Sequence, residues 1–159
     1  MRRRDRPEVP PETPPRLAAL RLLGRRDYTT VELTRKLTDR GYEPDVVEQT
    51  LAALRADRSL DDARAAASHV RMASRIKGRG RHRIKRELEA RGVPAAIAKA
   101  ALDELPKEDE SAQLARILAR KRPAGALTPA DRQRLFRQLL RRGFDGDAIS
   151  RALCLDTDE

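Results

Sequence analysis

The stretch "RELEARGVP" (residues 86–94) decides the fold, because two close copies of it stand elsewhere in the chain. Residues 35–43 read "RKLTDRGYE" and residues 137–145 read "RQLLRRGFD", so all three share R-x-L-x-x-R-G followed by an apolar residue. The three glycines are 51 positions apart (92 − 41 and 143 − 92), and the apolar positions around them align without a gap. A fixed period of this length indicates tandem copies of one supersecondary unit.

Each copy has the pattern of a helix that ends at a left-handed glycine. Glycine adopts positive φ without steric cost, and the Schellman ending places an apolar residue of the last helical turn against one that follows the glycine. The predicted endings are Leu37, Gly41 and Tyr42; Leu88, Gly92 and Val93; and Leu139, Gly143 and Phe144. The arginine before each glycine is expected to face the negative end of its own helix dipole, at Arg40, Arg91 and Arg142.

One helix follows each glycine and another precedes each repeated stretch, so every unit is predicted to hold three short helices. In the first unit the apolar positions are Leu17, Leu20 and Leu23 before the repeat, and Val46 and Val47 after it. Helix formers dominate, and aromatic residues make up only 3% of the chain. We predict an all-α fold of three tandem three-helix, helix-turn-helix-like repeats of about 51 residues, stacked into an elongated, curved molecule.

The chain is expected to divide into a tail and three units. Residues 1–15 contain five prolines and are predicted to form a flexible tail rich in Pro and Arg, because proline removes backbone donors and blocks helices. The predicted units are residues 16–60, 61–110 and 111–159. The second unit is strongly basic, and the third ends in a short acidic tail.

Positive charge is concentrated in the second unit. The chain has a net charge of +10, and nine Lys and Arg residues lie from Arg71 to Arg91, opposed there only by Glu87 and Glu89. Because so many like charges repel one another, the pattern favours an anionic partner, either acidic protein surface or nucleic-acid phosphates. The candidate partner-binding residues are Arg75, Lys77, Arg79, Arg81, Arg83, Lys85 and Arg86, extended by Arg137, Arg141 and Arg142 of the third unit.

Gly78 and Gly80 open a loop ahead of a helix inside this basic stretch. Glycines let a backbone approach phosphates closely, and a helix N-terminus adds positive potential, so the loop is a candidate phosphate contact. Sequence-specific readout is not expected, because the helices after Gly41 and Gly92 are neutral to acidic. Tyr28 is the main candidate for an exposed base-stacking side chain. Binding through phosphates would be salt-sensitive and weakly selective.

Catalysis is not expected. The only histidines are His69 and His82, and no metal-ligand spacing, nucleophile motif or phosphate-loop signature is present, so neither a metal nor a cofactor is expected. His69 is expected to be partly buried. The single cysteine, Cys154, is predicted to be a small core residue, and a lone thiol fits a reducing cytoplasm. No apolar stretch approaches the roughly 18 residues of a membrane span.

Four longer stretches carry a family resemblance. They are "ALRLLGRRDYTTVELTRKLTDRGYEPDVVEQTLAAL", "SLDDARAAASHVR", "KGRGRHRIKRELEARGV" and "FRQLLRRGFDGDAISRAL". In order and spacing they resemble the RecX family, regulators of the bacterial recombinase RecA, over roughly residues 16–155. The resemblance implies tandem three-helix repeats without catalytic activity. It also implies binding to RecA and to its filament on single-stranded DNA, and reduced ATPase, strand-exchange and coprotease activity in DNA repair and recombination.

The resemblance suggests DNA as a further partner. Contact with a membrane is not expected, because no apolar stretch is long enough, and a monomer is expected. Ala65 and His69 stand where the family usually has aromatic residues, and Ser59 replaces another, which is expected to thin the joint between the first two units. Two other interpretations stay open. One is a general basic DNA-binding protein without RecA specificity, and the other is a helical adaptor that ignores DNA.

Overall fold

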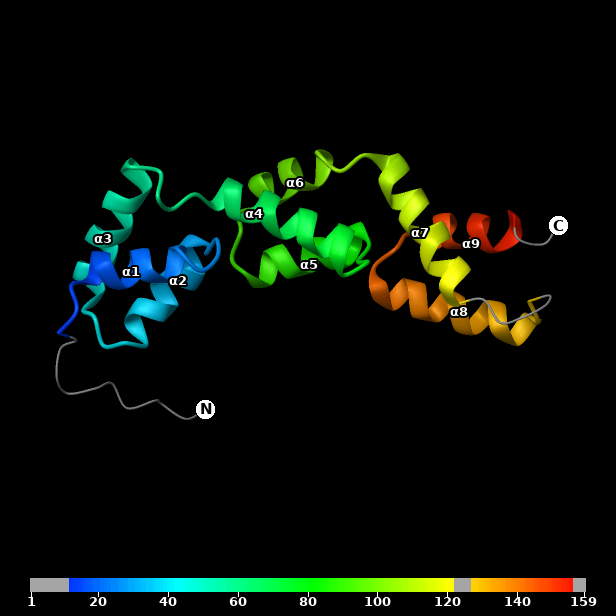
Figure 1. The fold of residues 1–159 in the computed structure, drawn as a ribbon, viewed down its shortest axis with the longest axis horizontal. Helices are drawn as coiled ribbons and strands as arrows, with labels where there is room; N and C mark the ends of the chain where they lie inside the picture. Colours follow the sequence, from blue (N-terminus) through cyan, green and yellow to red (C-terminus); the bar gives the residue numbers. More distant parts are fainter. Residues whose placement is uncertain (1–11, 122–126, 156–159) are drawn as a thin grey trace.

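The computed structural model describes residues 12–121 and 127–155, and every regular element in these ranges is a helix. Three three-helix units follow one another in a row, which confirms the predicted fold class (Figure 1). The expected flexible and acidic tails fall largely on residues 1–11 and 156–159, outside the described residues. The elements are α1 (Pro15–Leu23), α2 (Thr30–Thr38), α3 (Pro44–Ala56), α4 (Asp62–Arg71), the π-helical turn η1 (Met72–Ile76), α5 (Arg81–Ala90), α6 (Ala95–Asp103), α7 (Lys107–Lys121), α8 (Pro129–Arg142) and α9 (Gly146–Leu155).

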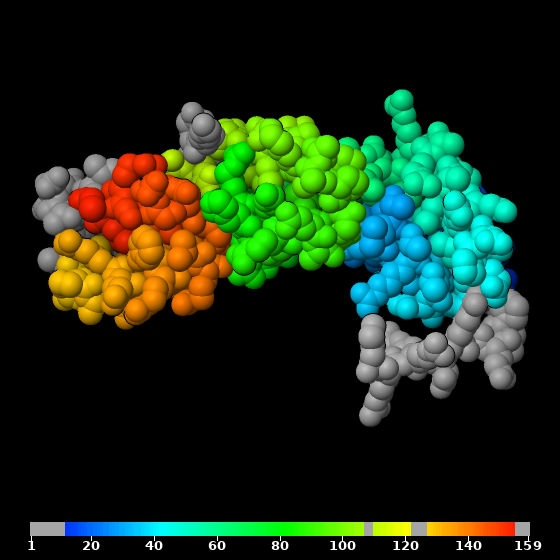
Figure 2. All heavy atoms as spheres, turned by 180° about the vertical axis from the view of Figure 1, so that it is seen from behind, coloured from blue at the N-terminus to red at the C-terminus, as the bar shows by residue number. Residues whose placement is uncertain are grey.

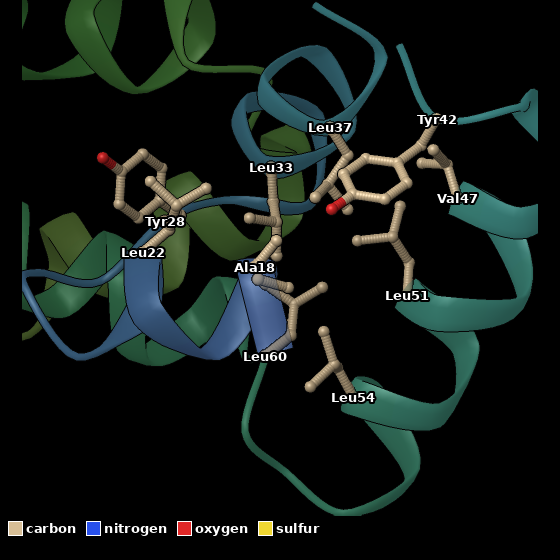
Figure 3. Close-up of a cluster of buried hydrophobic side chains, with 11 residues drawn as sticks. Ala18, Leu22, Tyr28, Leu33, Leu37, Tyr42, Val47, Leu51, Leu54 and Leu60 are labelled. Atoms are coloured by element: carbon tan, nitrogen blue, oxygen red, sulfur yellow. The ribbon is translucent and has the colours of Figure 1, made fainter. Parts of the chain in front are cut away.

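Each unit has its own cluster of buried apolar side chains. In the first unit Leu33 and Leu37 of α2 pack between α1 and α3 and are fully buried, with Leu54 of α3 completing the centre (Figure 3). The second cluster centres on Ile84 and Leu88, and the third on residues of α7, α8 and α9. Seen from behind, the units again lie one after another, in colour order from blue to red (Figure 2). The joints between units therefore decide the shape of the molecule.

The three predicted helix endings are confirmed. Gly41, Gly92 and Gly143 have φ values of 93°, 74° and 87°. In each ending the N–H after the glycine donates to the carbonyl oxygen of the buried leucine, with N–O distances of 3.3 Å at Tyr42, 3.0 Å at Val93 and 3.3 Å at Phe144. In all three endings the glycine N–H donates to the carbonyl oxygen of the residue that follows this leucine. This double pattern is the Schellman motif, and the paired apolar side chains are buried.

Four expected core positions are exposed instead. In α1 the buried side chains are Ala18, Ala19 and Leu22, so Leu17 and Leu20 face outward, with 43% and 38% of their surface exposed. Small alanines let α1 approach the other two helices closely, which places the flanking leucines off the interface. Cys154 is also exposed, because α9 buries Ile149 and Leu153 and the next residue turns away from that face. Val46, 38% exposed, likewise lies beside the buried Val47.

Side-chain caps fix where several helices begin. Thr29 and Glu32 form a capping box at α2, in which the Thr29 hydroxyl accepts from the Glu32 N–H at 3.1 Å and the Glu32 carboxylate accepts from the Thr29 N–H at 3.0 Å. Asp61 caps α4 and Asp145 caps α9, each carboxylate accepting from a backbone N–H of the first turn. Glu32 has a second role, because the same carboxylate also reaches the middle unit.

Candidate partner-binding surface

The glycine-rich loop of the basic stretch lies at the joint between the middle and third units. The Gly80 N–H donates to the Arg142 carbonyl at 2.9 Å, and the His82 N–H donates to the Gly143 carbonyl at 3.1 Å. A Cβ on Gly80 would stand 2.3 Å from the Gly143 oxygen, and a Cβ on Gly143 would stand 2.3 Å from the Arg83 nitrogen. The glycines therefore allow two backbones of this chain to touch. The N–H groups of Gly78 and Gly80 already donate to the Ser74 and Arg142 carbonyl oxygens. The expectation that this loop binds phosphates through its backbone is therefore wrong.

Further contacts secure this joint. The buried Gln113 side chain of α7 donates to the Ser74 carbonyl of η1. The Arg81 N–H donates to the Glu110 carboxylate at 3.2 Å, so another N–H at the start of α5 has a partner within the chain. The Arg83 guanidinium reaches the Arg141 carbonyl at 3.4 Å. The start of α5 and the end of α8 thus lie end to end along one side of the molecule (Figure 1).

Glu87 gathers several of the predicted partner-binding cations. Oε1 of its carboxylate lies 2.6 Å from Nη1 of Arg79 and 3.0 Å from Nε of Arg83. Oε2 lies 3.0 Å from Nε2 of His69. Partial burial opposes ionisation of Glu87, yet hydrogen bonds from Arg83, Arg79 and His69 hold its pKa below the usual value. Burial lowers the pKa of His69 although the bond to Glu87 opposes this, which confirms a partly buried histidine. Arg79 and Arg83 therefore stabilise the middle unit through their ion pairs with Glu87.

Arg81 and Arg142 are also engaged. Arg81 donates to the Leu105 carbonyl at 3.1 Å and lies 3.6 Å from Asp103. The Arg142 guanidinium packs on the loop, where a Cβ on Gly78 would lie 3.2 Å from Nη1. The predicted candidates whose side chains are exposed form what we call the cationic surface: Arg75, Lys77, Lys85, Arg86, Arg137 and Arg141. Lys85 makes an exposed contact of 3.9 Å with Glu89, which holds it weakly.

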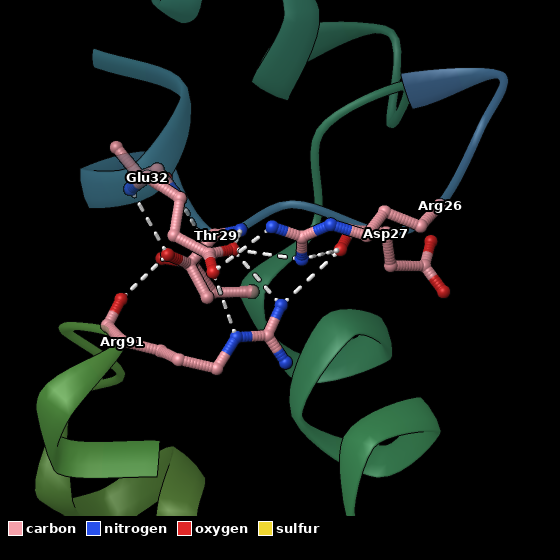
Figure 4. A network of polar contacts seen from close by, with 7 residues as sticks. Arg26, Asp27, Thr29, Glu32 and Arg91 are labelled. Atoms are coloured by element: carbon pink, nitrogen blue, oxygen red, sulfur yellow. Dashed lines mark hydrogen bonds and ion pairs between the residues drawn. The ribbon is translucent and has the colours of Figure 1, made fainter. Parts of the chain in front are cut away.

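The first and middle units meet through a polar joint centred on Arg91 (Figure 4). Arg91 donates to both carboxylate oxygens of Glu32, at 3.0 and 2.9 Å, and to the Asp27 carbonyl at 3.2 Å. The Thr29 hydroxyl donates to the Arg91 carbonyl at 2.6 Å. Burial opposes ionisation of Glu32, but hydrogen bonds from Arg91, the Thr29 N–H and Arg26 lower its pKa to about 2. Arg91 thus joins two units, a role beyond the expected contact with its own helix dipole.

The two joints use equivalent positions of the repeat. Thr29 and Gly80 are one period apart, as are Arg91 and Arg142. In the first joint the Arg91 carbonyl accepts from the Thr29 side chain, and in the second the Arg142 carbonyl accepts from the Gly80 backbone. The Schellman endings of the middle and third units therefore each dock on the start of the second helix in the preceding unit. The 51-residue period carries this signal, whereas the pattern within a single unit does not.

Tyr28 does not offer a free aromatic face. Only 9% of its surface is exposed, and the Arg26 guanidinium lies 3.8 Å from the ring centroid. The expected base-stacking role is therefore wrong. His69 and Ala65 pack within the middle unit, where Ala65 is buried and His69 meets Glu87. Polar contacts around Arg91 connect the first two units.

Within the described ranges, no group of three His, Cys, Asp or Glu side chains is placed to hold a metal ion. None of the helices described is long and apolar enough to cross a membrane.

Comparisons with known proteins match the whole row of units. Family models described as the first, second and third three-helix domains of RecX match residues 16–54, 61–102 and 108–153. A protein of Halorhodospira halophila named "Regulatory protein RecX" is 44% identical over 147 residues, covering 89% of this chain and 87% of that protein. One of Stenotrophomonas maltophilia strain K279a with the same name is 39% identical over 152 residues, covering 94% and 91%. The crystal structure of RecX from Lactobacillus salivarius shares the fold, with a TM-score of 0.80, 23% identity, and coverage of 89% of this chain and 95% of that one.

Proposed function

The chain belongs to the RecX family, and we propose that it regulates the RecA recombinase by binding RecA and the RecA filament on single-stranded DNA. Binding is proposed to reduce ATP hydrolysis, strand exchange and coprotease activity in cytoplasmic DNA repair and recombination. The name "Regulatory protein RecX", shared by its relatives, supports a regulatory role. The protein is proposed to act without catalysis of its own.

The observation that carries the proposal is the cationic surface on a row of equivalent units. Arg86 on α5 and Arg137 on α8 are both exposed, and their helices lie end to end across the second joint (Figure 1). A row of similar units can follow a helical polymer with one kind of contact repeated along it. Interspersed Lys and Arg side chains on such a row fit acidic protein surface or DNA phosphates along a filament.

The alternative is a general basic DNA-binding protein without RecA specificity. The net charge of +10 favours it, and the exposed cations would bind phosphates. Two features weigh against it: the N–H groups at the start of α5 are bonded within the chain, and Tyr28 is buried. Contacts limited to side-chain charges make a weak nucleic-acid site at physiological salt.

One binding comparison separates these functions. The full chain is titrated against bare single-stranded DNA, free RecA and the assembled filament at several salt concentrations. A RecA regulator binds the filament and RecA more tightly than bare DNA at physiological salt. A general DNA-binding protein binds bare DNA as well as the filament, and its log affinity falls with log salt by about 0.7 per phosphate contacted. That second pattern would overturn the proposal.

A further inference from the structure

The most exposed large apolar side chain in the described part of the chain lies inside the basic stretch. Ile76, the last residue of η1, has 81% of its surface exposed, against 52% for Val31 and 48% for Leu140. One period later, Leu127 is buried in the core of the third unit at 8% exposure. The middle unit therefore exposes an apolar side chain at the end of η1, whereas the third unit buries the one that stands a period later, just before the Thr128 cap of α8.

A π-helical turn is the reason. The Lys77 N–H donates to the Met72 carbonyl, five residues back, at 3.2 Å. In a regular α-helix Lys77 would follow Val70 and Ala73 on the buried face. The wider turn buries Ala73 and Ser74 together instead and leaves Ile76 and Lys77 exposed. Single π turns inside α-helices are uncommon and often occur at functional sites.

Contacts with the third unit hold this turn in place. The Ser74 carbonyl accepts from the buried Gln113 of α7. The chain leaves the turn through Gly78, at φ 60°, against which Arg142 packs. Because its backbone is fixed on both sides, Ile76 is presented in a set position, and an interface that uses it loses little conformational freedom on binding.

The surroundings of Ile76 are apolar at the centre and cationic at the edge. Met72, one turn earlier, is 36% exposed. Arg71, Arg75 and Lys77 are exposed on the same turn or next to it, and no Asp or Glu stands between Asp62 and Glu87 in the sequence. An aliphatic side chain surrounded by cations complements an apolar pocket surrounded by carboxylates.

We propose that Ile76, together with Met72, is the apolar anchor through which this protein binds a partner protein whose surface has an apolar pocket edged by Asp and Glu. The inference rests on the proposed function, so the partner is RecA in its filament. Single-stranded nucleic acid would instead favour an aromatic platform, because bases stack on rings. Two aliphatic side chains also bury too little area to hold a lipid surface.

The test uses full-length Ile76→Ser, which removes the apolar surface and keeps every charge. Affinity for the RecA filament is expected to fall about 10-fold or more, since burying an isoleucine contributes that much. The slope of log affinity against log salt should not change. Ile76→Leu should bind like the wild type. The matched control is Val46→Ser, which alters an exposed apolar residue of α3 at 38% exposure and should not weaken binding.

The outcomes keep the two proposals apart. If the wild type binds the filament and Ile76→Ser binds equally well, the anchor is refuted while the proposed function stands. If the wild type does not bind RecA or its filament, the proposed function fails and the anchor with it. Parallel titrations with bare single-stranded DNA and with anionic lipid vesicles complete the test. A loss in either of these as large as the loss on the filament would also overturn the anchor.

Discussion

Arg91 and Glu32, 59 positions apart, form a two-point ion pair across the joint between the first and middle units, with N–O distances of 3.0 and 2.9 Å. Both side chains are largely buried, at 16% and 21% exposure. Planar two-point pairing fixes orientation as well as distance, so this contact sets how the first unit sits on the second.

Arg91→Ala is expected to lower the free energy of unfolding by about 2–4 kcal/mol, because it leaves the Glu32 carboxylate partly buried with fewer donors. Chemical denaturation followed by circular dichroism measures the loss. Arg91→Lys keeps the charge but not the two-point geometry and should fall between the wild type and the alanine variant. A double-mutant cycle with Glu32→Ala should show coupling, and additive effects would contradict a direct pair.

The same joint predicts a pH dependence. The pKa of Glu32 is lowered from 4.5 to about 2 in the folded chain, so its contribution to stability is present above pH 4.5 and is lost as the pH falls toward 2. Glu32→Gln removes this titration. Unfolding free energies measured from pH 6 down to pH 2.5 should therefore fall less steeply in Glu32→Gln than in the wild type. Parallel curves would show that Glu32 is not held ionised by Arg91.

Gly80→Ala tests the second joint. Gly80 has φ −77°, which any residue adopts, so the obstacle to a methyl group is the peptide between Gly143 and Phe144, whose oxygen, carbon and nitrogen would lie 2.3, 2.4 and 2.4 Å from the Cβ. Moving that backbone should cost about 1–3 kcal/mol of stability. Small-angle X-ray scattering should show a larger radius of gyration as the third unit shifts.

Gly24→Ala is the matched control for that variant. Its φ is −66°, and the nearest atom to an added Cβ is the Leu20 oxygen at 3.4 Å, an ordinary contact distance. Stability should stay the same or rise by a few tenths of a kcal/mol, because alanine restricts the unfolded chain. If both variants behaved alike, close backbone contact at Gly80 would not be what holds the joint.

Separating the cations by role gives another prediction. Arg86→Ala and Arg137→Ala should each weaken filament binding roughly 3- to 10-fold and leave the unfolding free energy unchanged, because both side chains are exposed. Arg79→Ala should lower the unfolding free energy and leave filament binding unchanged, since Arg79 lies 2.6 Å from Glu87 inside the middle unit. Binding titrations paired with thermal unfolding measure both effects. Equal binding losses at all three sites would contradict the division between surface and structural arginines.

The helix endings could be predicted from sequence because they depend on local geometry. Gly41 needs positive φ, and Leu37 and Tyr42 must meet beside it, which a stretch of nine residues reveals. The same reasoning explains why the fold class could be predicted: each unit repeats the same local signals.

The role of the basic residues could not be predicted in the same way. Charge in a sequence does not show which carboxylate lies nearby, and Glu87 engages Arg79, Arg83 and His69 only after α4 and α5 pack together. Tyr28 looked exposed because its burial depends on packing within the first unit and on Arg26 lying over its ring. The exposure of Ile76 follows from a π turn fixed by a distant glutamine, Gln113.

Regulation of RecA by this protein is tested by ATP hydrolysis of RecA on single-stranded DNA while the full-length protein is titrated in. Hydrolysis is expected to fall as the protein is added, and strand exchange is expected to fall with it. The variants Arg86→Ala and Arg137→Ala should need more protein for the same effect. Hydrolysis that is unchanged at excess wild-type protein, with no binding to the filament, would contradict it.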